Sequence, residues 1–446
     1  MGVRVPPTAP IAPPELACEA AALARGLGLL RTRAWCCVPA MARTFPFSKQ
    51  QVIVLLVCVG IFALGQFHRA SGAVFTPILM DRFTLSAASI GGLVSVMYFA
   101  NIVVQMPFGA ALDRIGPRPV LTVCVLLIAF GSVLFAFGTG FEALFVSRIL
   151  IGIGTAAMAA ATHVIIARNF APRDFGYISG LVVTLGGIGG LLGTYPLAFA
   201  LERAPWPVVF GFVALAAFVL AGTVLRAVQP GVRAREVGPE AGGFLSLLRD
   251  AEFRKILALG IVTYGPITTI TGLWGGPYLQ DVAGFSAEGA GAVLLVLFGA
   301  TIFGAAAFGQ MDRHFASRKR VILGAVLASS FSLAVLAGVP GLPVPLVIGL
   351  LLIAVFAQQF FIALGAHMRR VVPDAMLGRA STLLALVSVA AIPLMQIGFG
   401  AVLDIGARAG FGAQVQYRMA FGCLGAMIFA CGLVYATARN VDEERV

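Results

Sequence analysis

Apolar runs long enough to cross a bilayer recur along the whole chain, separated by short polar connections. A helix of about twenty apolar residues spans the hydrocarbon core, and a helix satisfies its own backbone hydrogen bonds there. Hydrophobic residues make up 59% of the chain and charged residues 11%. A water-soluble protein has about twice this share of charged residues. We therefore predict an all-α membrane protein with twelve transmembrane helices, near residues 51–80, 87–111, 119–139, 141–168, 175–201, 206–227, 255–280, 287–311, 320–338, 343–370, 376–403 and 416–438.

The basic residues lie mainly on alternate connections between the apolar runs. If both termini are cytoplasmic, the inner connections from Met41 onward carry 21 Lys or Arg and the outer connections carry four. A bias of this size fixes the orientation by the positive-inside rule. The net charge of +12 is spread over these connections and forms no single patch, so we expect a lipid bilayer and no nucleic acid as partner.

The connection between the second and third runs carries the most informative motif. It reads Gly109, Asp113, Arg114, Gly116 and Arg118 at fixed spacing. Gly109 allows a neighbouring helix to approach, Gly116 turns the chain, and Asp113 can face the positive end of another helix. The motif resembles the loop signature of the major facilitator superfamily, G-x-x-x-D-R-x-G-R-R/K, although Pro117 replaces the first Arg of the final pair. The resemblance implies a latch that closes the cytoplasmic side in the outward-open state.

A weaker copy of this motif follows about half a chain later, with Asp312 and Arg313 as its acidic and basic residues. Asp113 and Asp312 are 199 residues apart, and a second pair of matching segments places Pro172 and Pro373 201 residues apart. Two nearly equal offsets indicate an internal duplication. We predict two pseudo-symmetric six-helix bundles, as in the superfamily, with boundaries at 1–50 (N-terminal extension and lead-in), 51–227 (first bundle), 228–254 (cytoplasmic linker), 255–438 (second bundle) and 439–446 (cytoplasmic tail).

Arg69 lies near the middle of the first predicted helix, on a face with small neighbours. A cation at this depth is costly and should face a cavity, a partner or a ligand. We favour an anion-binding role, and the alternative is a structural Arg bonded to helix-end carbonyls. In the superfamily, helices 1, 4, 7 and 10 line the central cavity. The candidate substrate-binding residues on those helices are Arg69, Thr155, Tyr264, Thr268, Thr271, Trp274 and Gln358. Gly265 and Pro266 predict an interruption of the seventh helix.

The sequence does not determine whether an ion gradient drives transport. No Asp or Glu lies in the middle third of any predicted helix. His68 and His163 could titrate, although packing is the commoner role of a histidine in such a helix. Arg148, with Gly152 and Gly154, resembles a second superfamily motif, R-x-x-x-G-x-G, and either a structural or a substrate-facing role fits it. Symport, uniport and exchange all stay open.

These features together predict a transporter that moves a small organic solute bearing a carboxylate by alternating access. The alternatives are a non-transporting sensor or receptor of the same fold, and an exporter of neutral or cationic compounds. We expect no enzyme, no catalytic residue, no metal and no cofactor, because the four histidines are scattered and acids are few. No G-x-x-x-x-G-K-[ST] occurs, which argues against ATP-driven pumping by this chain. We expect a monomer in a bacterial inner membrane. Residues 1–40 read as a disordered tail or an over-long start assignment.

Overall fold

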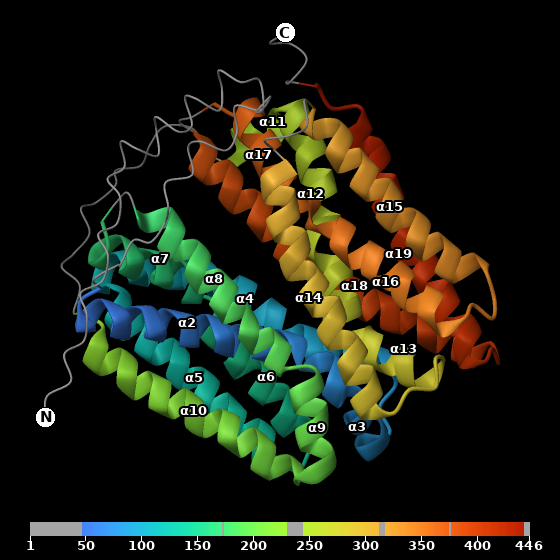
Figure 1. Ribbon diagram of the computed structural model, residues 1–446, viewed down its shortest axis with the longest axis horizontal. Coiled ribbons are helices and arrows are strands. Elements are labelled where there is room, and N and C mark those ends of the chain that lie inside the picture. The colour runs from blue at the N-terminus through green and yellow to red at the C-terminus, as the bar shows by residue number, and fades with distance from the viewer. Residues whose placement is uncertain (1–46, 172–173, 230–243, 312–316, 374–375, 441–446) are drawn as a thin grey trace, which may run out of the picture. The chain divides into compact units, whose positions relative to one another are not determined.

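Each apolar run corresponds to one helix or to consecutive helices in the computed structural model, which describes residues 47–171, 174–229, 244–311, 317–373 and 376–440 (Figure 1). The predicted N-terminal extension, most of the predicted linker, and Asp312 with Arg313 lie outside the described residues. Twelve spans in the described part are long and apolar enough to cross a membrane. The part from Lys49 onward forms one unit, and the description below concerns that unit.

The first six spans run from blue to green in Figure 1. Their helices are α2 (Lys49–Ala70) with α3 (Gly72–Phe83), α4 (Ala87–Ile115), α5 (Pro117–Phe137), α6 (Phe141–Thr155) with α7 (Met158–Asn169), α8 (Phe175–Leu192) with α9 (Tyr195–Arg203), and α10 (Trp206–Ala227).

The short α11 (Phe244–Arg249) precedes the last six spans, which run from yellow to red. Their helices are α12 (Ala251–Thr269) with the π-turn η2 (Ile270–Trp274) and α13 (Gly275–Asp281), α14 (Ala287–Met311), α15 (Arg318–Gly338), α16 (Val344–Ala357) with the 3₁₀ turn η3 (Gln358–Phe360) and α17 (Phe361–Val371), α18 (Leu377–Arg408), and α19 (Ala413–Ala436).

The two sets of six spans form two bundles with equivalent internal packing. In the first bundle α2 packs on α8, α5 on α10 and α6, and α4 on α6. In the second bundle the corresponding pairs are α12 with α18, α15 with α19 and α16, and α14 with α16. The duplication predicted from the motif offsets therefore reappears as a repeated set of helix contacts.

We name the two ends of these antiparallel spans by their helices. The proximal end is where α2 and α5 begin, and the distal end is where α3 ends and α4 begins. At the proximal end, the Gln50 side chain donates to the Ala227 carbonyl at 2.8 Å. At the distal end, Trp206 donates to the Phe135 carbonyl at 2.8 Å.

Five of the described spans are interrupted: the first, fourth, seventh and tenth near their middle, and the fifth between α8 and α9. The first breaks at Ser71, the fourth between Thr155 and Met158, the seventh at η2 and the tenth at η3. Interrupted helices are tolerated at membrane depth where they border protein or a cavity, and they are common at transporter binding sites. The interrupted spans include the four that the sequence resemblance assigns to a central cavity, and the fifth span in addition.

The two bundles approach each other closely in the distal half. A Cβ atom added at Gly72 would lie 2.1 Å from the Gly272 carbonyl oxygen, and one added at Gly276 would lie 1.8 Å from the Ala73 carbonyl oxygen. Only glycine allows the backbones of α3, η2 and α13 to meet in this way. Helices α4 and α18 also pack against each other, and the Ser95 hydroxyl donates to Gln396 Oε1 at 2.9 Å.

Candidate functional site

Arg69 lies in the last turn of α2, directly before the break at Ser71, and its side chain is exposed. Its Nη1 donates to Gln66 Oε1 at 3.2 Å. A Cβ built on Gly272 of η2 would lie 2.9 Å from the carbonyl oxygen of Arg69, so the two bundles approach each other closely at Arg69. Arg69 therefore lies at the boundary between the two bundles, next to the Gly72–Gly272 contact.

Tyr264 belongs to the most enclosed of the spans, of which 78% is buried, and yet the residue itself is 38% exposed. This exposure comes from a cavity of about 470 Å³ that Tyr264 lines with residues of α12, α17 and α18. The ring of Tyr264 packs on Phe361, with centroids 4.7 Å apart. Thr268 lies one turn further on, is partly exposed, and donates to the Tyr264 carbonyl at 2.9 Å.

The polar lining of this cavity includes residues that sequence analysis did not select: Thr263, Arg369, Ser381 and Ser388. Thr263 donates to Ser388 Oγ at 2.9 Å and ties α12 to α18. Arg369 lies near the proximal end of α17 and is exposed. Among the described residues that line the cavity there is no acid, so its charge is positive. The sequence did point to Arg369, because two consecutive Arg end the tenth span. No sequence feature singled out Thr263, Ser381 or Ser388.

Four of the predicted binding residues are buried in this conformation, each with a hydrogen bond inside its own bundle. Thr155 accepts from Asn101 Nδ2 at 3.0 Å, and Thr271 donates to the Ile267 carbonyl at 2.8 Å. Trp274 Nε1 donates to the Gln396 carbonyl at 3.0 Å, in the closed distal half. Gln358 Nε2 donates to Ser329 Oγ at 3.2 Å. Of the predicted binding residues, Tyr264 belongs to the described lining of the cavity. Thr268 lies one turn beyond Tyr264 and Arg69 lies at the bundle boundary, and neither belongs to that lining.

Arg148 and His68 form a buried cluster away from the cavity. The guanidinium of Arg148 lies between the rings of Phe75 and Phe135, 4.4 and 4.5 Å from their centroids. Its Nη1 is 3.4 Å from the His68 carbonyl oxygen, and the His68 ring bonds to Ser132 Oγ at 3.2 Å. In this conformation Arg148 contacts the His68 carbonyl of α2 and the Phe75 ring of α3, on either side of the break at Ser71.

His163 lies elsewhere, on the exposed face of α7, with its ring 6.0 Å from that of Phe175. It is therefore not brought together with His68 or Arg148. The described residues contain no group of three or more His, Cys, Asp or Glu that could hold a metal ion.

The signature motif lies at the proximal end, where α4 gives way to α5. Gly116 has φ of 83°, a conformation that favours glycine. Arg114 is exposed and Arg118 is partly buried, and nothing of the described protein lies within 4 Å of a Cβ built on Gly109. The close neighbour that we expected at Gly109 is thus absent from the described part in this conformation. The side chain of Asp113 lies outside the described residues.

A different acid, Asp404, joins the bundles at the distal end. Its Oδ1 and Oδ2 accept hydrogen bonds from the backbone amides of Ala87 and Ala88, both at 2.9 Å, at the start of α4. Sequence analysis missed this residue. The signal was present, since Gly400-Ala401-Val402-Leu403-Asp404 repeats the pattern of Gly109-Ala110-Ala111-Leu112-Asp113.

A second group of polar contacts joins the bundles at the same end. Tyr195 donates to Glu288 Oε1 at 2.7 Å, and Arg203 forms an ion pair with Glu288 at 3.7 Å. In this conformation the distal half is closed by hydrogen bonds, an ion pair and backbone packing, and the cavity lies on the proximal side.

Comparison with known proteins agrees with this architecture. A family model described as Major Facilitator Superfamily matches residues 55–394. The uncharacterized transporter YybO of Bacillus subtilis (strain 168) is 30% identical over 151 residues, which are 34% of this chain and 35% of the relative. The hexuronate transporter of the same organism is 24% identical over 317 residues, which are 66% of this chain and 74% of the relative. The chain thus spans about a third of the length of the first relative and three quarters of the second.

Among solved structures, a bacterial homolog to the human lysosomal transporter Spinster, crystallised in an inward-facing and unoccupied conformation, has a TM-score of 0.73. Its sequence is 16% identical, and the match covers 89% of this chain and 98% of that chain. At this identity the likeness shows the fold alone.

Proposed function

Because the chain belongs to the major facilitator superfamily, whose members are membrane transporters, we propose that it carries a small organic anion bearing a carboxylate. The observation that carries this proposal is the exposed Arg69 at the boundary of the two bundles, together with a cavity in the second bundle whose only described charged lining residue is Arg369. A guanidinium binds a carboxylate through two parallel hydrogen bonds. The relative named as a hexuronate transporter acts, by its name, on a sugar acid, which also favours an anionic substrate.

Each part of the site has a role in this proposal. Arg69 binds the carboxylate, and the phenol of Tyr264 and the hydroxyl of Thr268 bind the remainder of the solute. Phe361 provides an apolar wall beside Tyr264. Arg369, nearer the proximal opening, attracts the anion toward the cavity. A neutral or cationic solute would leave both guanidinium groups without a partner charge.

Transport proceeds by alternating access. The positive-inside bias supports a cytoplasmic proximal end, so this conformation is open to the cytoplasm and closed outside, as in the inward-facing structure that the fold resembles. Asp404 stabilises the outer closure by capping α4. In the outward-open state the proximal motif with Asp113 closes the cytoplasmic side, and Asp113 and Asp404 act in alternation.

The test is a panel of ligands added to the purified protein in detergent, with the thermal midpoint as readout. The panel holds hexuronates, monocarboxylates, dicarboxylates and amino acids, together with neutral sugars and organic cations of matched size. A ligand of the folded state stabilises it by RT ln(1 + [L]/Kd), about 2.7 kcal/mol at a hundredfold excess over Kd. We expect a shift with carboxylates that is lost in Arg69→Ala and kept in Arg226→Ala, which removes an exposed Arg at the end of α10.

The same carboxylate must then cross the membrane of proteoliposomes. Binding without flux would identify a receptor of this fold. Stabilisation by neutral or cationic compounds, equal in wild type and Arg69→Ala, would overturn the anion assignment.

A further inference from the structure

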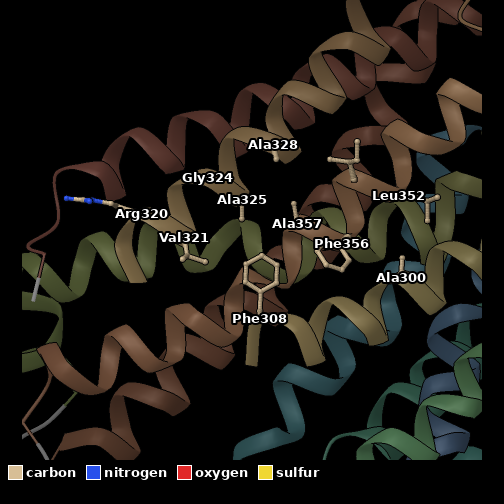
Figure 2. Close-up of a pocket in the computed structure, with 11 residues that line it drawn as sticks. Ala300, Phe308, Arg320, Val321, Gly324, Ala325, Ala328, Leu352, Phe356 and Ala357 are labelled. Carbon is tan, nitrogen blue, oxygen red and sulfur yellow. The ribbon is translucent and has the colours of Figure 1, made fainter. Parts of the chain in front are cut away.

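A groove of about 650 Å³ runs along the outer face of the second bundle, between α14, α15 and α16. Figure 2 shows Phe308 and Phe356 at its floor, with Gly324, Ala325 and Ala328 of α15 along one wall. The small residues of the lining leave the space: Gly324, Ala325 and Ala328 on α15, with Ala300 on α14 and Ala357 on α16. This groove takes no part in the transport site described above.

The surroundings of the groove are apolar and exposed. Leu327 and Phe331 on α15 are 54% and 68% exposed, and Phe303 on α14 is 75% exposed. In a membrane-spanning bundle such a face contacts lipid hydrocarbon. The lining of α15 extends from position 320 to 328, which corresponds to about 12 Å of helix. An elongated apolar groove on this face fits an acyl chain.

One end of the groove is basic. Arg320 projects from that end in Figure 2, and its side chain is exposed. Arg320 already has an interaction partner, and the five N–H donors of a guanidinium leave others for a further acceptor. It lies in the first turn of α15, whose sequence begins Arg318-Lys319-Arg320, at the proximal end of the bundle. Among the described residues that line the groove there is no acid. Basic pockets between helices at the cytoplasmic surface are typical binding sites for anionic lipid headgroups.

We propose that this groove is a binding site for an anionic phospholipid of the surrounding bilayer. One acyl chain lies between α14, α15 and α16, and the headgroup phosphate contacts Arg320. The apolar lining of the groove favours an acyl chain, and Arg320 at its proximal end favours a negatively charged headgroup. A soluble anion lacks the chain and a neutral lipid lacks the charge.

The site has a structural consequence for the tenth span. Phe356 and Ala357 line the groove and directly precede the break at Gln358–Phe360. A bound chain therefore packs against the helix turn next to that break and stabilises the second bundle as a whole.

The second bundle also offers a matched control groove. It has a volume of about 350 Å³, lies beside α18 and α19, and is lined by apolar residues including Gly398, with no charged residue among the described lining. Gly324 and Gly398 both have open space where a Cβ would stand. At either position the Cβ of a leucine meets no neighbouring atom within 4 Å, and both glycines line their grooves, so leucine is the matched substitution.

The experiment measures the thermal midpoint of delipidated protein in mixed micelles with dioleoyl phosphatidylglycerol, dioleoyl phosphatidylcholine or inorganic phosphate. Native mass spectrometry counts the bound lipids. We expect phosphatidylglycerol to raise the midpoint at lower concentration than phosphatidylcholine, and phosphate to have no effect. Arg320→Gln should weaken the apparent affinity for phosphatidylglycerol about fivefold, the contribution of one interfacial cation.

Gly324→Leu should abolish this binding, whereas Gly398→Leu and Arg226→Gln should keep it. A preference for phosphatidylglycerol that survives both Arg320→Gln and Gly324→Leu would overturn the proposal. So would equal stabilisation by the two lipids in wild type, because the headgroup selection would then be absent.

Discussion

Asp404 of α18 caps Ala87 of α4 across the boundary between the two bundles, with 2.9 Å between Oδ1 and the backbone nitrogen. The first amides of a helix have no partner within it and carry the positive end of the helix dipole, so a carboxylate is their best acceptor. The acid and the helix come from different bundles. Closure of the distal half therefore depends on a contact that must break when the bundles separate.

Replacement of Asp404 by Asn should shift the protein toward the state that is open at the distal end. Hydrogen bonds to a charged group contribute about 1.5–3 kcal/mol each, so even partial loss changes the population roughly tenfold. The measurement is the alkylation rate of a cysteine placed at Val94, which is 6% exposed beneath the distal closure. In a protein without its other cysteines, this rate should rise about tenfold in D404N.

Glu142→Gln is the control for the Asp404 prediction. Glu142 is an exposed acid in the first turn of α6 at the same end, within one bundle. Its neutralisation should leave the Val94→Cys rate unchanged. Equal rates in Asp404→Asn and in the parent protein would show that the cap does not hold the distal half closed.

Substitution of a glycine in the distal contact should open the distal half as substitution of Asp404 does. In Gly72→Ala the new methyl group would lie 2.1 Å from the Gly272 carbonyl oxygen, which is backbone and cannot rotate away. Overpacking of this kind costs about 1–3 kcal/mol or more. We expect the Val94→Cys alkylation rate to rise in Gly72→Ala and stay constant in Gly92→Ala, because Gly92 has open space at the Cβ position. An unchanged rate in both variants would contradict the structure at this contact.

The helices and their duplication were predictable from sequence because they depend on local composition and on recurring motifs. The seventh span shows where local reasoning stops. Gly265 and Pro266 were expected to interrupt it, and α12 does have a kink, but the kink lies at Val262, with φ −100° and ψ 19°, and not at Pro266 itself. A proline ring clashes with the carbonyl four residues earlier, so the distortion falls at that earlier residue.

The candidate site was less predictable, because its side chains are satisfied by residues far away in sequence. Thr155 bonds to Asn101 and Gln358 to Ser329, 54 and 29 positions away. Helical periodicity gives the face on which such a residue lies but not the helix that covers the face. Asp404 is the extreme case, since its partners are 317 and 316 positions away.

The orientation in the membrane is testable without any substrate. Arg226 at the end of α10 and Arg408 at the end of α18 are both exposed, at the proximal and distal ends. With a cytoplasmic proximal end, a membrane-impermeant thiol reagent should label Arg408→Cys in intact cells and reach Arg226→Cys only after permeabilisation. The reverse pattern would invert the assignment of the two ends and with it the inward-open description.

The shape of the cation at position 69 should matter as much as its charge. Lysine keeps the charge in Arg69→Lys but donates from a single nitrogen, so it cannot make the paired hydrogen bonds of a guanidinium to a carboxylate. We expect the apparent affinity for the best carboxylate ligand to fall roughly tenfold in Arg69→Lys and further in Arg69→Ala, while Arg226→Lys has no effect. The measurement is the ligand concentration at half-maximal thermal shift. If Arg69→Lys binds like wild type, charge alone suffices, and the anion is attracted by Arg69 without being held by two hydrogen bonds.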